Sequence, residues 1–423
     1  MASHDENARL LQEYSRYMLP VLSFRDIVIT RGEGAYIWDA NGTRILDLNS
    51  GQFCAVFGHS NPGIGELLGR ITSKLQDTDT STLSDDVLFA AKRMHDICEG
   101  MNGRVIFLST GAEANECCLR YAKHIKEKPG VVAFDLGYHG LTHGTAAYSM
   151  SRARIRPTLE HSYVVRAPRA YYDDQLSDTE IEEYVAEFEQ LVSANREHIA
   201  AAIFEPIISG GGMVFPPKRY FQRIREICTA HDVFLVFDEC QTGFGRTGSW
   251  FYYQQLECVP DFLVCAKSMG LGFPVACVVA NGNSITHELF AMMHYSSHQN
   301  EPVAAQIVSY AIDTMSDRDM LRANSEKGRY LLDALNRLAR DYSIIADPRG
   351  KGLMCGFDLF VDGVQDYRDT GDLFCRHALE NQVLLQHCNN GRTIRLLPNY
   401  VIGTEQIDEL YTKLDSMLSR HYR

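Results

Sequence analysis

Short runs of apolar residues recur through the middle of the chain and restrict its fold more than any other feature. Stretches with helical periodicity separate these runs from one another. Strands that are apolar throughout and alternate with helices are typical of a mostly parallel sheet whose two faces are covered by helices. The sequence therefore predicts an α/β fold of this kind. The predicted strands are Arg104–Leu108, Val131–Phe134, Ala201–Phe204, Val233–Phe237, Phe262–Cys265 and Ala276–Ala280.

The regions around these strands carry helical periodicity or turn signals. Residues 8–20 are predicted to form an amphipathic helix ended by Pro20, since proline does not continue a helix. The dipeptide Asn41-Gly42 lies between two alternating stretches and predicts a tight hairpin. The predicted helices of the central region are Glu113–Ile125, Asp178–Ser193 and Lys218–Ala230.

The two ends of the chain predict a second, smaller domain. After residue 305 comes a long helical stretch, then short strands around 352–360 and 393–397 and a terminal helix. This mixture predicts an α+β domain, which we expect the N-terminal segment to share. The expected division is an N-terminal segment at 1–60, a large α/β domain at 61–305 and a small α+β domain at 306–423.

Composition excludes several classes of partner and site. The net charge is −13 and no basic block offsets it, which argues against nucleic acid or an anionic membrane as partner. The 12 cysteines include no C-x-x-C pair, so neither a disulfide scaffold nor a zinc site is predicted, and we expect no metal. The N-terminus is polar and no apolar run is long enough to span a membrane, so we expect a cytoplasmic protein.

Polar residues follow five of the predicted strands. Ligands of open α/β sheets bind at the carboxyl ends of the strands, so we expect these residues to meet in one crevice. They are Ser109-Thr110-Gly111-Ala112, Tyr138-His139-Gly140, Glu205-Pro206, Asp238-Glu239-Cys240-Gln241 and Lys267.

Lys267 and Asp238 form the most informative pair in this set. A lysine amine forms a Schiff base with pyridoxal 5'-phosphate, and an aspartate holds the ring nitrogen of that cofactor protonated so that the ring accepts electrons. A lone lysine is weak support, because most lysines are solvated surface groups. An amine and a carboxylate at the ends of two buried strands together predict this cofactor.

A phosphate site is predicted where Gly111 opens a helix. Glycine lets the backbone approach an anion, and a helix N-terminus offers unbonded N–H groups and a positive dipole. The alternative is an ordinary strand–helix turn that Ser109 or Thr110 caps.

Four further residues have both a functional and a structural interpretation. Tyr138 could stack on a planar cofactor or be a half-buried core tyrosine. Cys240 is small enough to pack against the other face of a ring, or to be core filler. Glu205 and Gln241 could bond near the ring oxygen, although buried polar side chains need partners in any fold.

A glycine-rich stretch offers a competing hypothesis. Gly243-Phe244-Gly245-Arg246-Thr247-Gly248 matches the G-x-G-x-x-G pattern of dinucleotide-binding proteins, and Asp261 follows at about the distance of a ribose-binding acid. The first glycine stands away from the strand end, however, and the aromatic residues after Gly248 open a poor helix. A turn-rich loop around another cofactor is favoured over a dinucleotide-dependent oxidoreductase.

Taken together, these motifs resemble the class III (omega-type) aminotransferases of the fold-type I pyridoxal-phosphate enzymes. The resemblance implies an enzyme that moves an amino group between an amino acid or amine and a keto acid. It also implies a homodimer with its active sites at the subunit interface. The stretches that carry the resemblance are Ser109–Ala114, Tyr138–Gly140, Glu205–Ile207, Asp238–Gly248 and Lys267 with Gly270, Gly272 and Pro274 after it.

The resemblance implies a role for each matching residue. Lys267 would form the Schiff base and carry the proton, Asp238 would pair with the ring nitrogen, and Gln241 would lie near the phenolic oxygen. Lys267 and Asp238 are thus the predicted catalytic residues. Ser297 would complete the phosphate site of a second subunit. The full predicted cofactor-binding set is Gly111, Ala112, Tyr138, His139, Glu205, Asp238, Cys240, Gln241, Lys267 and Ser297.

Within the family, two stretches look most like the dialkylglycine decarboxylase branch. They are Ser50–His59 and Ser296–Pro302. The resemblance implies that Gln52 helps position a carboxylate that is lost and that Arg395 binds the substrate carboxylate, for which a guanidinium fork is well suited.

Two positions depart from that branch, which has tryptophan where this chain has Tyr138 and alanine where it has Cys240. The departures favour simple transamination over decarboxylation. Decarboxylating transamination, amino-acid epimerisation and a catalytically silent scaffold are the remaining alternatives on this fold.

Overall fold

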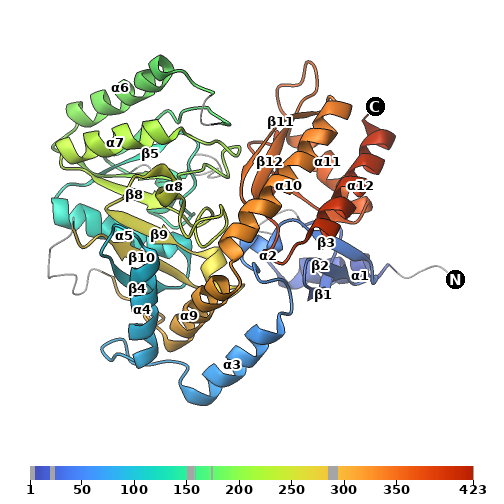
Figure 1. Cartoon of the computed structure of the whole chain (residues 1–423), viewed down its shortest axis with the longest axis horizontal. Helices are drawn as coiled ribbons and strands as arrows, with labels where there is room; N and C mark the ends of the chain where they lie inside the picture. The colour runs from blue at the N-terminus through green and yellow to red at the C-terminus, as the bar shows by residue number, and fades with distance from the viewer. Residues whose placement is uncertain are drawn as a thin grey trace.

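A seven-stranded sheet forms the centre of the larger of two lobes (Figure 1). The computed structural model describes residues 5–19, 24–149, 157, 159–172, 175–283 and 294–422. The strand order is β4-β10-β9-β8-β7-β5-β6, and the prediction of a mostly parallel sheet is confirmed because only β10 runs antiparallel to its neighbours. The strands are β4 (Arg104–Leu108), β5 (Gly130–Phe134), β6 (Ser162–Val165), β7 (Ile199–Phe204), β8 (Phe234–Asp238), β9 (Phe262–Cys265) and β10 (Ala276–Ala280).

Helices cover both faces of this sheet, as its uniformly apolar strands require. Along β5, Val131 and Ala133 join one hydrophobic cluster with α5, whereas Val132 and Phe134 join the other with α6 and α7. Alternation of side chains along a strand explains this division. The helices of this lobe are α3 (Pro62–Lys74), α4 (Asp85–Ile97), α5 (Gly111–Lys126), α6 (Asp178–Ala194), α7 (Lys218–Ala230), α8 (Tyr252–Leu256) and α9 (Pro302–Asp317).

The smaller lobe joins the two ends of the chain (Figure 1). The strands β1 (Ile29–Glu33), β2 (Tyr36–Asp39) and β3 (Arg44–Asp47) share a sheet with β13 (Val383–Leu384). The expected sharing of this lobe by the N-terminal segment agrees with that pairing, while the boundaries at 60 and 305 stay predictions. A second sheet contains β11 (Ile345–Lys351), β12 (Met354–Leu359), β15 (Thr393–Leu396) and β14 (Gln386–Cys388), beside helices α10 (Met320–Asp341), α11 (Arg368–Glu380) and α12 (Thr404–His421).

The N-terminal helix differs from its predicted bounds. α1 spans Glu6–Tyr17, because the Asp5 carboxylate caps it by accepting from the Ala8 N–H and Met18 is already extended. The predicted end at Pro20 is therefore wrong, and Pro20 itself lies outside the described residues. The hairpin at Asn41-Gly42 is confirmed between β2 and β3, with Gly42 at a φ of 83°.

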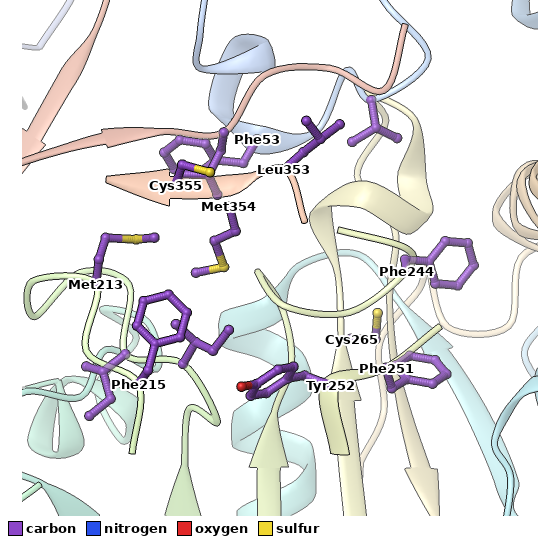
Figure 2. Close-up of a cluster of buried hydrophobic side chains, with 14 of the residues drawn as sticks. Phe53, Met213, Phe215, Phe244, Phe251, Tyr252, Cys265, Leu353, Met354 and Cys355 are labelled. Atoms are coloured by element: carbon purple, nitrogen blue, oxygen red, sulfur yellow. The ribbon is translucent and has the colours of Figure 1, made fainter. Parts of the chain in front are cut away.

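Apolar side chains fill the boundary between the lobes (Figure 2). Met213 and Phe215 of the larger lobe lie across from Met354 of β12 and Phe53. All four are nearly inaccessible to solvent, so this boundary is a continuous core rather than a loose contact.

Among the described residues, no helix combines the length and hydropathy of a membrane-spanning segment.

A buried ion pair reinforces the same boundary. Arg349 of β11 donates to Oδ1 of Asp358 on β12 over 2.5 Å, and both side chains are fully buried. The same guanidinium donates to the carbonyl oxygens of Met213 at 2.9 Å and Gly212 at 2.6 Å, which belong to the larger lobe. Its Nη1 donates to the carbonyl oxygen of Asp347 at 2.7 Å, so one cation bonds to backbone on both sides of the boundary.

Candidate active site

The polar residues at the five strand ends come together at one edge of the sheet, as expected. Gly111, the first residue of α5 after β4, lies close to the end of β8. A Cβ atom on Gly111 would lie 2.7 Å from Sγ of Cys240. Gly140 has a φ of 116°, and a Cβ there would lie 2.5 Å from Cβ of Ala112. Glycine is required at both approaches because any side chain would collide.

Three hydrogen bonds hold the Asp238 carboxylate at the end of β8. Its Oδ2 lies 2.8 Å from Nδ1 of His139 and accepts from Nδ2 of Asn115 at 2.8 Å. Its Oδ1 accepts from the Cys240 N–H at 3.1 Å. Burial by itself raises the pKa of Asp238, but the His139 and Cys240 hydrogen bonds and the charge of Lys267 lower it below the usual value. Asp238 is therefore held as a buried anion.

The N-terminus of α5 offers the expected anion site. Thr110 caps the helix, and its hydroxyl accepts from the Glu113 N–H at 3.2 Å. The N–H groups of Gly111 and Ala112 precede that bond and donate to no other group in the described part of the chain. The cap leaves these two N–H groups available to an anion, so the two interpretations of this turn do not exclude each other.

Both carboxylate oxygens of Glu205 accept hydrogen bonds from backbone N–H groups. Its Oε1 accepts from the N–H of the half-buried Tyr138 at 2.7 Å, and its Oε2 accepts from the Ser209 N–H at 3.4 Å. Burial raises the pKa of Glu205 to about 7, against the opposing charges of His139 and Lys267. The carboxylate fixes the turn that carries Tyr138.

Ser209 is a member of the site that the sequence did not reveal. Its hydroxyl donates to Oε1 of Gln241 at 2.8 Å and accepts from Nη1 of Arg395 at 3.1 Å. Arg395 is fully buried on β15, and its Nη2 donates to Oε1 of Gln386 at 2.6 Å. One serine thereby joins the predicted cofactor residue Gln241 to the predicted substrate residue Arg395.

Lys267 begins the 3₁₀ turn η2 (Lys267–Gly270) directly after β9. Its φ of 54° is a left-handed value that lysine rarely adopts, and such backbone strain is typical of functional sites. The charge of this half-buried lysine lowers the pKa values of both Asp238 and Glu205, against the raising effect of their burial. The amine of Lys267 therefore lies near enough to both carboxylates to interact with their charges.

Gln52 and Ser297 stand apart from the contacts described so far. Gln52 is exposed in the short, strained α2 (Ser50–Phe53), whose last residue underlies the Arg395 guanidinium at 4.6 Å. Ser297 is exposed on a turn that Asn300 ties to β4, through a bond from the Phe107 N–H to the Asn300 side chain at 2.9 Å. Neither side chain has a hydrogen bond within the described residues, so their roles stay predictions.

The G-x-G-x-x-G stretch has a different role from a dinucleotide loop. A Cβ on Gly245 would lie 2.3 Å from Cε of Met315, and one on Gly248 would lie 1.9 Å from Oγ of Ser325. These glycines thus admit α9 and α10. Asp261, the supposed ribose ligand, accepts from the Leu235 N–H and from Arg225, each at 2.7 Å. This geometry gives no support to the oxidoreductase hypothesis.

The residues present fit pyridoxal phosphate. Unbonded N–H groups at the start of α5 suit a phosphate, and the ionised Asp238 suits a protonated ring nitrogen. Lys267 supplies the amine, and the close approach of Gly111 to Cys240 leaves no room for a larger side chain at Gly111. The donor set therefore matches the cofactor that the sequence predicts.

Comparison with known proteins gives the same family. The family model described as aminotransferase class-III matches residues 21–418. The acetylornithine aminotransferase of Vibrio vulnificus (strain YJ016) is 29% identical over 418 residues, covering 96% of each chain.

Solved structures share the whole fold. An aminotransferase of Bacillus anthracis superposes with a TM-score of 0.91 at 22% identity, over 99% of this chain and 100% of that one. An (S)-enantioselective omega-transaminase of Thermomicrobium roseum has a TM-score of 0.88 at 25% identity, over 98% of each chain. With the family match over nearly its whole length, the chain belongs to the class III aminotransferases, which use pyridoxal phosphate to transfer amino groups.

Proposed function

We propose that Lys267 and Asp238 are the catalytic residues of this transaminase. The observation that carries the proposal is the meeting of the strained Lys267, the buried anion Asp238 and the N-terminus of α5 at one edge of the sheet. When bound, pyridoxal phosphate supplies an electron sink for the bond broken at the substrate carbon. Gly111 and Ala112 would hold its phosphate.

Each protein group then has a defined task. Nζ of Lys267 takes the proton from the substrate carbon and returns it, because it is the amine of the crevice. Asp238 stays ionised and holds the ring nitrogen protonated, a state that its bonds from His139 and Cys240 favour. Tyr138 would cover one face of the ring and Cys240 the other, while Gln241 would lie near the phenolic oxygen.

We propose that the substrates are amino acids and keto acids that bind through a carboxylate. Arg395 is buried on β15, and its guanidinium contacts include the oxygens of Ser209 and Gln386. A guanidinium fork binds a carboxylate well, which suits Arg395 to the carboxylate of an amino acid or keto acid. The related Vibrio vulnificus protein is named for acetylornithine, an amino acid that fits this class.

A substrate screen tests this proposal. The holoenzyme is mixed with single amino acids and with amines that lack a carboxylate, and loss of the cofactor absorbance is followed. We expect amino acids to react with kcat/KM at least tenfold above matched amines, and the preference to disappear in Arg395→Ala. Carbon dioxide measured in the same samples distinguishes transamination from decarboxylation. Equal reactivity of amines and amino acids would contradict the assignment of Arg395.

We also propose a homodimer in which Ser297 serves the partner's phosphate site. Ser297 is exposed, and Leu88 and Phe89 of α4 are exposed apolar residues suited to an interface. Light scattering should give twice the mass of the chain, and Ser297→Ala should weaken cofactor binding.

Hybrid dimers test the exchange of this serine. A Lys267→Ala subunit donates an intact Ser297 to a Ser297→Ala subunit that keeps its own Lys267. Mixing the two variants under conditions of subunit exchange should restore tight cofactor binding at that hybrid site. No gain over the separate variants would show that Ser297 acts within its own chain or not at all.

A further inference from the structure

A cluster of metal-binding side chains lies on the smaller lobe, away from the crevice. His377 and Glu380 are on α11 and His421 is the last residue of α12. One ligand atom from each of the three residues lies within 4.8 Å of the others. The spacing of three residues on α11 puts His377 and Glu380 on the same helix face, so both side chains point toward the end of α12.

The imidazoles of His377 and His421 lie close together as a stacked pair. Their ring centroids are 4.0 Å apart and the planes differ by 16°. The hydroxyl of Tyr422 lies 3.0 Å from Nδ1 of His377, and the Tyr422 ring packs against Phe374 at 5.6 Å between centroids. A second group that holds one ring nitrogen is the usual way in which proteins orient a metal-binding histidine. For Nε2 of His377, no hydrogen bond is found within the described residues.

We infer that His377, Glu380 and His421 bind one divalent transition-metal ion, of which zinc is the representative. Two imidazole nitrogens and one carboxylate oxygen suit Zn²⁺, whereas Mg²⁺ and Ca²⁺ prefer sites made only of oxygen. The partly exposed position leaves the remaining coordination sites to water. The bound ion joins the end of α12 to α11 and stabilises the fold without taking part in amino transfer.

Calorimetry on the untagged, chelator-treated holoenzyme tests the inference. Titration with ZnCl₂ should show one saturable site with a Kd in the micromolar range or tighter, and MgCl₂ should show none. His377→Ala, His421→Ala and Glu380→Gln should each weaken Zn²⁺ binding at least tenfold. The matched control is His124→Ala, which removes an exposed histidine from α5 and should bind Zn²⁺ like the wild type.

Thermal unfolding and activity give independent readouts. Zn²⁺ should raise the Tm of the wild type and of His124→Ala but not of His421→Ala, while transaminase activity stays unchanged in all three. Binding only at millimolar Zn²⁺, or equal affinity in the wild type and His421→Ala, would overturn the inference. Since the activity assay is separate, a failure here leaves the proposed function untouched.

Discussion

Nδ1 of His139 lies 2.8 Å from Oδ2 of Asp238, and both side chains are buried. The contact joins the turn after β5 to the end of β8. His139 is one of the predicted cofactor-binding residues, and that role stays a prediction. Its contact with the carboxylate leads us to expect that its influence passes through Asp238.

The first prediction concerns this hydrogen bond. His139→Leu removes the donor, so burial should raise the pKa of Asp238 and reduce its ability to hold the ring nitrogen protonated. A bond to a charged group contributes about 1.5–3 kcal/mol, so kcat should fall roughly 10- to 100-fold. His139→Asn keeps a donor near the Nδ1 position and should retain more activity.

The spectrum of the bound cofactor provides the control for that prediction. Titration of its absorbance with pH should shift in His139→Leu and shift less in His139→Asn, while Asp238→Ala should lower kcat by orders of magnitude in a folded protein. An unshifted titration in His139→Leu with the same loss of kcat would assign His139 a merely structural role.

The second prediction concerns Ser209, which bonds to both Gln241 and Arg395. Ser209→Ala leaves the guanidinium less firmly oriented, so KM for amino-acid and keto-acid substrates should rise about tenfold, equivalent to roughly 1.4 kcal/mol. KM for an amine without a carboxylate should change little in the same variant. Equal changes in both values would mean that the serine acts on the cofactor side only.

The third prediction concerns stability at the lobe boundary. Asp358→Ala leaves the charge of Arg349 buried without its anion, which should reduce the free energy of unfolding by about 3–5 kcal/mol. The matched control is Asp313→Ala, because Arg93 and Asp313 form a pair with 36% and 53% exposed side chains. Its loss should stay below about 1 kcal/mol. Similar losses in the two variants, measured by denaturant unfolding of the holoenzyme, would contradict the account.

The fourth prediction concerns the pH dependence that Glu205 creates. Its pKa is raised from 4.5 to about 7, so the folded state binds this proton more tightly than the unfolded state does. Stability from this group is complete below about pH 4.5 and declines as pH rises toward 7, by about 3 kcal/mol in total. The free energy of unfolding is measured for the cofactor-free wild type and Glu205→Gln at pH 5 and pH 8. The decrease between these two pH values should be smaller in Glu205→Gln by about 3 kcal/mol. An identical decline in both proteins would contradict it.

The strands of the large sheet were predictable because burial of both faces leaves continuous apolar runs. β6 was missed since only its last residue is fully buried. β11 was missed because it contains Asp347-Pro348 and an irregular register beside β12. The direction of β10 was also beyond prediction, because an apolar run has the same composition in parallel and antiparallel strands.

Only some of the candidate site residues could be predicted from the sequence. Residues that follow strands could be grouped from their position alone, which found Lys267 and Asp238. Asn115 and Ser209 were missed because their contacts depend on tertiary proximity. The available signal in the sequence was the glycine run Gly210-Gly211-Gly212 directly after Ser209. In the structure this run passes close to another segment, since a Cβ on Gly211 would lie 2.5 Å from the Leu136 carbonyl oxygen.

Identification of the lysine that holds the cofactor decides whether Lys267 is the catalytic amine. The holoenzyme is treated with borohydride, which fixes the cofactor to its amine, and peptides are then examined by mass spectrometry. We expect a single pyridoxyl group on Lys267 and none in Lys267→Ala, which should fold normally and lose turnover. A pyridoxyl group on another lysine of the wild type, or an active Lys267→Ala, would contradict this assignment.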